Sequence, residues 1–275
     1  NVIIIAVEAL RYDGINARLY GKPVMPFLSS LLSDETSYNR AYSQAPDTEY
    51  SLRTITTGLY PLKYPHRDII NNNVFVEEEL PSILMTAGYR TSSFSVFDWS
   101  SMRSNAYSRN YDFISDPTFD GGALELLDQL QKRQLKAGVV GTIDRQQLIS
   151  RLDQINIDRL VEWSSKENER PFFSLLYLYS SHFPYTIPNE DVHSWVKQSN
   201  EDIYYFSPKD KELYLKRYYQ SLQHVDSLIA NLVERLKKQG DLDDTVLIIT
   251  GDHGEEFYEH GNCLHIGNLH QEVIH

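Results

Sequence analysis

The 275-residue sequence is poor in cysteine and in basic residues. Its one cysteine, Cys263, has no partner within the chain, which excludes an internal disulfide framework. Lysine and arginine number 26 against 38 aspartates and glutamates, and the resulting net charge of −12 argues against a general nucleic-acid binder. No apolar run approaches the ~20 residues of a membrane-spanning helix. The sequence also lacks an initiator methionine and a signal peptide, so we expect it to be a piece of a longer protein.

Three runs of mainly apolar, uncharged residues have the pattern of strands that are buried on both faces. They are Val2–Val7, Phe172–Tyr179 and Thr245–Thr250, and the third is predicted to be a central strand. Helical periodicity covers Asp144–Ser164 and Lys209–Gln239, so strands alternate with helices along the chain. This alternation predicts an α/β fold with a doubly wound, mostly parallel central sheet.

Several shorter elements are also predicted. The expected strands are Thr36–Tyr42 and Tyr89–Val96, and the expected helices are Pro26–Leu32, Leu52–Gly58, Glu77–Ala87 and Ala123–Leu135. Residues 98–120 give mixed signals and are interpreted as an irregular insertion that borders the cleft. No linker or internal repeat divides the chain, so one domain over residues 1–275 is expected.

Polar side chains follow the ends of the three long strands. Glu8 follows the first strand, His182 lies just past the second, and Asp252 and His253 follow the third. Ligands of open α/β sheets gather beyond the carboxyl ends of the strands, and a buried carboxylate is costly unless it is paired or binds a cation. A turn with a solvated Asp and His is the competing interpretation, but the matching chemistry at the other strand ends favours a metal site.

Thr48 lies in a polar loop that leads into the predicted helix Leu52–Gly58. The N-terminus of a helix favours an anion such as phosphate or sulfate, although an N-cap is the commoner role for such a threonine. With Glu8, Asp252 and His253, Thr48 gives an O/O/O/N ligand set. This set suits one Mn²⁺ or Zn²⁺; Mg²⁺ is also acceptable, and Ca²⁺ is less natural beside a histidine. A metal bound to the threonine oxygen would make it a usable nucleophile.

These residues occur in an order that resembles a known family. A strand ending in Glu8 is followed by Thr48 before a helix that ends Thr-Gly-Leu-Tyr-Pro, by His-Phe-Pro-Tyr from His182, and by Gly-Asp-His-Gly-Glu from Gly251. His265 follows near the end of the chain. This order resembles the sulfatase-like branch of the alkaline phosphatase superfamily. The resemblance implies an α/β/α sandwich and a metal-assisted attack on a phosphate or sulfate ester.

Two positions indicate which enzymes of that branch the chain resembles most. Sulfatases oxidise a Cys or Ser to formylglycine within Cys/Ser-x-Pro-x-Arg; here Thr48 takes that position, with Tyr50 and Leu52 in place of Pro and Arg. The first strand ends in Glu8-Ala9, not in the paired aspartates of sulfatase calcium sites. Glu with Thr is similar to lipoteichoic acid synthases and phosphoethanolamine transferases. Those enzymes are membrane-anchored, have extracytoplasmic catalytic domains, and pass a phospholipid head group through a phospho-threonine.

The resemblance implies roles for six residues. The metal ligands are Glu8, Thr48, Asp252 and His253, Thr48 is also the nucleophile, and His182 and His265 bind substrate phosphate, assist proton transfer or hold a second metal. The implied substrate is a phospholipid or glycan ester, and the implied membrane contact is through a segment outside this chain. Two alternatives stay open: a sulfuric ester or phosphonate ester hydrolase, and a catalytically inactive domain that binds lipid or protein. Three further residues, which either position an anion or form surface salt bridges, are Arg11, Asp13 and Arg53.

Overall fold

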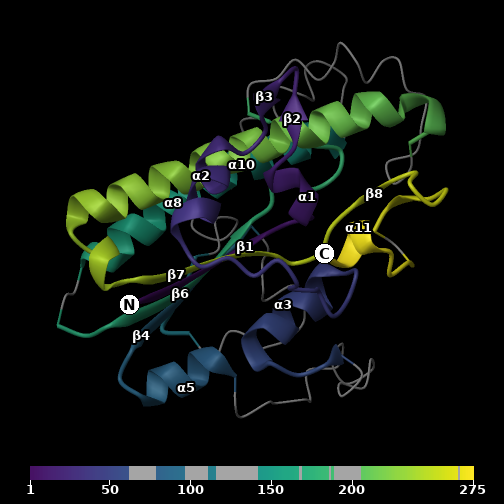
Figure 1. Ribbon diagram of the computed structural model, residues 1–275. Helices are drawn as coiled ribbons and strands as arrows, with labels where there is room; N and C mark the ends of the chain where they lie inside the picture. The colour runs from purple at the N-terminus through teal and green to yellow at the C-terminus, as the bar shows by residue number, and fades with distance from the viewer. Residues whose placement is uncertain are drawn as a thin grey trace, which may run out of the picture.

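The computed structural model describes residues 1–61, 79–96, 111–115, 142–166, 169–185, 187–188, 206–265 and 267–275. Its main sheet has five parallel strands in the order β5-β4-β6-β1-β7 (Figure 1). The strands are β1 (Val2–Val7), β4 (Arg90–Phe94), β5 (Phe113–Ser115), β6 (Phe172–Leu178) and β7 (Val246–Gly251). The predicted α/β fold with a mostly parallel sheet is confirmed.

Helices and two small hairpins complete the described part of the chain. The helices are α1 (Tyr12–Ile15), α2 (Pro26–Asp34), α3 (Thr48–Thr57), α5 (Leu80–Thr86), α8 (Thr142–Ser165), α10 (Lys211–Gln239) and α11 (Gln271–Ile274). The hairpins pair β2 (Arg18–Leu19) with β3 (Lys22–Pro23), and β8 (Glu256–Phe257) with β9 (Cys263–Leu264). Within the described ranges, no helix combines the length and the apolar character needed to cross a bilayer.

Helices cover both faces of the sheet, as Figure 1 shows. Alternate residues of β1 enter different cores: Ile3, Ile5 and Val7 pack in one apolar cluster, and Ile4 and Ala6 in the other. Helices α2 and α10 cover the first face, α3 and α5 cover the second, and α8 contributes to both clusters. Side chains of a strand alternate between faces, so a strand with this pattern must be enclosed between two helical layers.

The predicted central position of the third strand is wrong for the sheet as described. Strand β7 pairs with β1 at the edge of the five-stranded sheet, and Val246 and Ile248 are 60% and 44% exposed. Leu247 and Ile249, on the opposite face, pack against the larger core. A continuous apolar run predicts a strand but does not indicate its place in the sheet, because an edge strand can carry the same residues.

The shorter predictions had mixed outcomes. No strand forms at Thr36–Tyr42, where the backbone is irregular and Tyr38 is 79% exposed, so the segment has no core contact to fix a strand. The other predicted strands and helices appear with shifted ends wherever they fall on described residues. Within residues 98–120, which were interpreted as irregular, strand β5 forms at Phe113–Ser115. The prediction for Ala123–Leu135 lies outside the described residues, as do Glu77 and Glu78.

Asp226 of α10 joins two helices of the first layer. Its carboxylate accepts hydrogen bonds from the backbone N–H groups of Phe27 and Leu28, both at 2.9 Å. These groups belong to the first turn of α2, whose N-cap residue, Met25, makes no side-chain capping bond. Asp226 therefore caps α2 from a distant helix.

Replacing Asp226 by alanine should destabilise the chain by about 1–3 kcal/mol, because two backbone donors lose a partly buried acceptor. Asp226→Asn should cost less, since its carbonyl oxygen can still accept one of these bonds. Urea unfolding measures both effects. The exposed Asp243 supplies a matched control, for which alanine should change stability by no more than ~0.5 kcal/mol. Equal stabilities for Asp226→Ala and Asp243→Ala would contradict the capping role.

Candidate metal centre

The ends of two adjacent strands bring Glu8 and Asp252 together. Strands β1 and β7 are parallel and Val7 pairs with Gly251, so the residues that follow them lie side by side. The backbone N–H of Asp252 donates to the Val7 carbonyl at 3.2 Å, and that of Ala9 donates to Asp252 Oδ1 at 3.0 Å. Both carboxylate side chains are fully buried. The sheet therefore holds two buried acids close together, with a ligand oxygen of each within 4.8 Å of the other.

Thr48 reaches these acids from the first turn of α3. Its hydroxyl donates to Glu8 Oε2 at 3.1 Å and lies 3.3 Å from His253 Nε2. The helix is capped by Asp47, whose carboxylate accepts the N–H groups of the second and third helical residues, so Thr48 is not the N-cap. The Ser51 hydroxyl donates to the Asp252 carbonyl and ties α3 to the end of β7. The Thr48 hydroxyl is therefore left to face the acids.

The atoms of this cluster have the spacing of ligands that share one cation. Glu8, Asp252 and His253 each offer an atom within 4.8 Å of the others. His253 Nε2 lies 3.4 Å from Glu8 Oε1 and 3.6 Å from Asp252 Oδ2. Ligands on one zinc ion, with bonds near ~2.1 Å, are roughly 3–3.5 Å apart. Among the residues that the structure describes, buried Glu8 Oε1 has no hydrogen-bond partner, so an acceptor is available in the right place.

His253 presents one defined nitrogen to the cluster. Its Nδ1 lies 2.9 Å from the Gly254 carbonyl oxygen, and a carbonyl can only accept, so Nδ1 carries a proton. The other nitrogen, Nε2, faces Glu8 and Thr48. A backbone carbonyl behind a metal-binding histidine fixes the ring in this way in many metal sites. The residues present therefore fit a divalent cation held by Glu8, Thr48, Asp252 and His253.

The electrostatics of the cluster also favour a cation. Burial, followed by the neighbouring charge of Glu8, raises the pKa of Asp252. Burial lowers the pKa of His253, but the charges of Asp252 and Glu8 outweigh it and the net shift is upward. Two carboxylates cannot both stay ionised in a buried site without nearby positive charge. A divalent cation would supply that charge.

Tyr177 is a member of the cluster that the sequence interpretation missed. Its hydroxyl contacts Glu8 Oε2, lies 3.1 Å from Asp252 Oδ2, and lies 3.5 Å from Thr48 Oγ1. It comes from β6, which pairs with β1 so that Tyr177 is opposite Ala6. A phenol within an otherwise apolar strand, close to its carboxyl end, was the signal available in the sequence.

Asp153 of α8 is a second residue that was missed. It lies within the predicted helix Asp144–Ser164, in which no site residue was predicted, and it is fully buried. It accepts hydrogen bonds from the backbone of Tyr179 and from the backbone and hydroxyl of Ser180, at 2.5–3.1 Å. Burial raises the pKa of Asp153 to about 7. Asp153 thus holds the end of β6, from which the chain leads to His182.

His265 lies beside His253, and His182 lies beside His265. The ring centroids of His253 and His265 are 4.2 Å apart, and those of His265 and His182 are 6.4 Å apart. His265 Nδ1 pairs with Glu255 Oε1 at 3.0 Å; although burial lowers the pKa of His265, this carboxylate raises it to about 9. Burial lowers the pKa of His182 to about 4, and its ring stacks on Tyr179. At neutral pH one histidine is therefore cationic and the other neutral.

The remaining candidates do not join the cluster. Arg11 is buried and pairs with Asp13 at 2.6 Å and with Glu259 at 2.8 Å. Arg53 is also buried, and its guanidinium lies 3.8 Å from the Glu79 carboxylate. Of the expected surface salt bridges, the Arg53–Glu79 pair is buried on both sides, whereas Arg11 is buried but its partner Asp13 is exposed.

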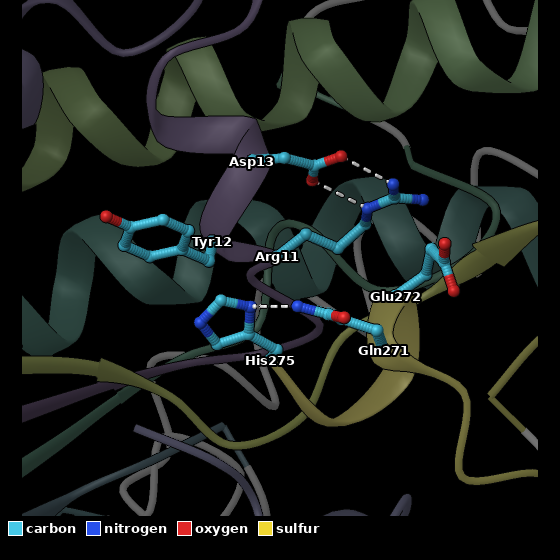
Figure 2. Close-up of a pocket in the computed structure, with 6 residues that line it drawn as sticks. All are labelled: Arg11, Tyr12, Asp13, Gln271, Glu272 and His275. Atoms are coloured by element: carbon cyan, nitrogen blue, oxygen red, sulfur yellow. Dashed lines mark hydrogen bonds and ion pairs between the residues drawn. The ribbon is translucent and has the colours of Figure 1, made fainter. Parts of the chain in front are cut away.

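A cavity of about 410 Å³, shown in Figure 2, is lined by Arg11, Tyr12, Asp13, Gln271, Glu272 and His275. None of these lining residues is a predicted metal ligand, and Figure 2 shows the Arg11 guanidinium turned to Asp13.

Comparison with known proteins places this geometry in a family. The sulfatase family model matches residues 1–272. A lipoteichoic acid synthase of Staphylococcus saprophyticus is 24% identical over 269 residues, which are 92% of this chain and 35% of that protein. The chain therefore spans about a third of the length of this relative.

Two solved structures show the same fold at low identity. The lipoteichoic acid synthase LtaP from Listeria monocytogenes superposes with a TM-score of 0.64 at 21% identity, over 92% of this chain and 56% of that one. A phosphonate monoester hydrolase from Silicibacter pomeroyi superposes with a TM-score of 0.69 at 17% identity, over 100% of this chain and 66% of that one. The predicted alkaline phosphatase-like fold is thus confirmed. Because the family model matches nearly the whole of this chain, the chain belongs to the sulfatase family.

Proposed function

We propose that residues 1–275 form one catalytic domain of a metal-dependent phosphotransferase or phosphodiesterase, with Thr48 as its nucleophile. The observation that carries the proposal is the Thr48 hydroxyl, which lies 3.1 Å from Glu8 Oε2 and 3.3 Å from His253 Nε2 at the start of α3. The hydroxyl already donates to a buried carboxylate, so its proton has an acceptor in place.

The first half of the reaction forms a bond between Thr48 Oγ1 and the phosphorus of a phosphate ester. The Thr48 proton passes to Glu8, and the bond from phosphorus to the leaving oxygen breaks. His265 donates its proton to that oxygen, and Glu255 stabilises the imidazolium until transfer. A bound divalent cation supplies Lewis-acid stabilisation of the negative charge that gathers on the phosphoryl oxygens.

The second half returns Thr48 to its starting state. An acceptor hydroxyl, or water, attacks phosphorus and gives its proton to His265, which is now neutral. The bond between phosphorus and Thr48 Oγ1 breaks, and the threonine oxygen recovers its proton from Glu8. Transfer and hydrolysis share this sequence of steps and differ only in the acceptor.

Mn²⁺ or Zn²⁺ is the proposed cation, because three oxygen ligands and one imidazole suit both. Mg²⁺ and Ca²⁺ prefer oxygen ligands throughout and are less suited beside His253. A second cation at His182 and His265 would require His265 to lose its proton and share its ion pair with Glu255. One cation is therefore the simpler arrangement.

The proposed substrate is the phosphate ester of a phospholipid head group or of a cell-envelope glycan. Support comes from the relatives named as lipoteichoic acid synthases. We also place the domain outside the cytoplasmic membrane, attached through a segment that is not part of this chain; support comes from the similar structures described as periplasmic domains of EptC.

A sulfuric ester or phosphonate ester hydrolase is the second candidate. The sulfatase family model and the superposition on a phosphonate monoester hydrolase favour it. A sulfatase activity is disfavoured, because sulfatases need a formylglycine at this position and Thr48 cannot be converted to one. A catalytically inactive binding domain is disfavoured, because such a domain has no use for two buried carboxylates arranged around a threonine hydroxyl.

Thr48→Ala should lower turnover of a bis-aryl phosphate by on the order of 10³–10⁶-fold, because the nucleophile is gone. Thr48→Ser should keep measurable turnover, and mass spectrometry of the quenched enzyme should find an aryl phosphoryl group on that residue in both active forms, since only one aryl group of the substrate leaves in the first step. Full turnover by Thr48→Ala would exclude the proposal. Activity on an aryl sulfate, with none on the bis-aryl phosphate, would instead favour the sulfatase alternative.

His265→Gln should slow esters with alkyl leaving groups by about 10²–10⁴-fold, because the leaving oxygen then lacks a proton donor. Nitrophenyl esters should be affected far less, since nitrophenolate leaves without a proton. His260→Gln is the matched control, because His260 is a half-exposed histidine outside the cluster. A loss that is the same for both kinds of ester would show that His265 is not the proton donor.

Mn²⁺ or Zn²⁺ should raise the melting temperature of chelator-treated protein, because the ligand binds the native state and stabilises it by roughly 2.7 kcal/mol at a hundredfold excess over Kd. Glu8→Gln should remove most of this rise. Anomalous scattering from crystals grown with each metal identifies the element and its ligands together. A peak away from Glu8, Asp252 and His253 would contradict the proposed centre.

A further inference from the structure

Tyr177 places a hydroxyl between the two buried carboxylates. The hydroxyl contacts Glu8 Oε2 and lies 3.1 Å from Asp252 Oδ2, while Thr48 Oγ1 is 3.5 Å away. It therefore touches three of the four groups assigned to the metal. No other tyrosine among the described residues has a recorded hydrogen bond to Glu8 or Asp252.

The hydroxyl is not needed to fill the core. Leu176 and Leu178, the neighbours of Tyr177 in β6, are fully buried, and the strand is buried along its whole length. Phenylalanine would occupy nearly the same volume at position 177. Burying the phenol oxygen has a desolvation cost that only its polar contacts can offset, and those contacts include both carboxylates.

The contacts of Asp252 show what the hydroxyl contributes. Asp252 Oδ1 accepts the backbone N–H groups of Ala9 and His253, at 3.0 and 2.7 Å. Asp252 Oδ2 has no backbone donor among the described contacts and faces the Tyr177 hydroxyl. On the other acid, the Tyr177 and Thr48 hydroxyls both meet Oε2 of Glu8. The Tyr177 hydroxyl thus contacts one oxygen of each carboxylate and restricts the orientation of both.

We propose that Tyr177 is a positioning residue of the metal centre: its hydroxyl holds the Glu8 and Asp252 carboxylates at the separation that a divalent cation requires. This inference rests on the proposed function, since it assumes that these acids bind the cation. Hydrogen-bonding partners of metal ligands typically contribute 10–100-fold to metal affinity. Donation to carboxylate oxygen also reduces the repulsion between the acids before the cation arrives.

Tyr177→Phe tests the proposal through metal affinity, measured by calorimetric titration of Mn²⁺ and Zn²⁺ into the chelator-treated chain. We expect affinity to fall by about 10–100-fold, because the carboxylates lose a shared donor. The control is Tyr38→Phe, the same substitution at a tyrosine that is 79% exposed and lies outside the cluster. That control should bind metal within about threefold of the wild type.

The outcomes separate this inference from the proposed function. Equal affinities for wild type and Tyr177→Phe would overturn the role of Tyr177 and leave the metal centre standing, whereas a wild type that binds no metal would overturn both. If Tyr177→Phe does not fold, wild-type protein labelled with ¹³Cζ-tyrosine gives the answer. One tyrosine resonance should shift when Zn²⁺ is added, and no shift in any would overturn the proposal.

Discussion

The closeness of two buried carboxylates, Glu8 and Asp252, is the constraint on which the rest of the site depends. Both side chains are fully buried, and parallel pairing of β1 and β7 leaves them no freedom to separate. The protein satisfies them unevenly: backbone donors serve Asp252 Oδ1, while Glu8 Oε1 has no hydrogen-bond partner. Buried charge of this kind is expensive unless positive charge lies close by. The arrangement of the two acids is therefore one that a bound cation would stabilise.

The strand order explains how distant segments meet this requirement. Strands β6, β1 and β7 are consecutive in the sheet and parallel, so all three end at the same edge. They deliver Tyr177, Glu8 and Asp252 to one place, although the chain between β1 and β7 contains all the other strands of the main sheet. Helix α3 then approaches from the second face, with Ser51 bound to the Asp252 carbonyl. Each group is thus held by an element whose own position is fixed by the core.

Sequence patterns predicted the parts of this arrangement that depend on burial and chain order. The apolar runs gave the three long strands, and the residues just past them gave Glu8, Asp252 and His253. The edge position of β7 could not be predicted, because an apolar run carries no information about neighbours in the sheet. Tyr177 was missed for a related reason: periodicity indicates that a side chain is buried, but the groups its hydroxyl meets come from strands and helices far away in the sequence.

The histidines near the cluster show how partners, not residue type, set the available chemistry. His253 donates Nδ1–H to a backbone carbonyl, which directs Nε2 to the acids. His265 has Glu255 behind it instead, and that fully buried carboxylate also accepts from the Tyr185 hydroxyl. A carboxylate in direct contact stabilises an imidazolium more strongly than a carbonyl does, so His265 is suited to give up a proton, whereas the carbonyl behind His253 fixes the ring with Nε2 toward the acids. Two imidazoles with centroids 4.2 Å apart could not hold such different roles without these different partners.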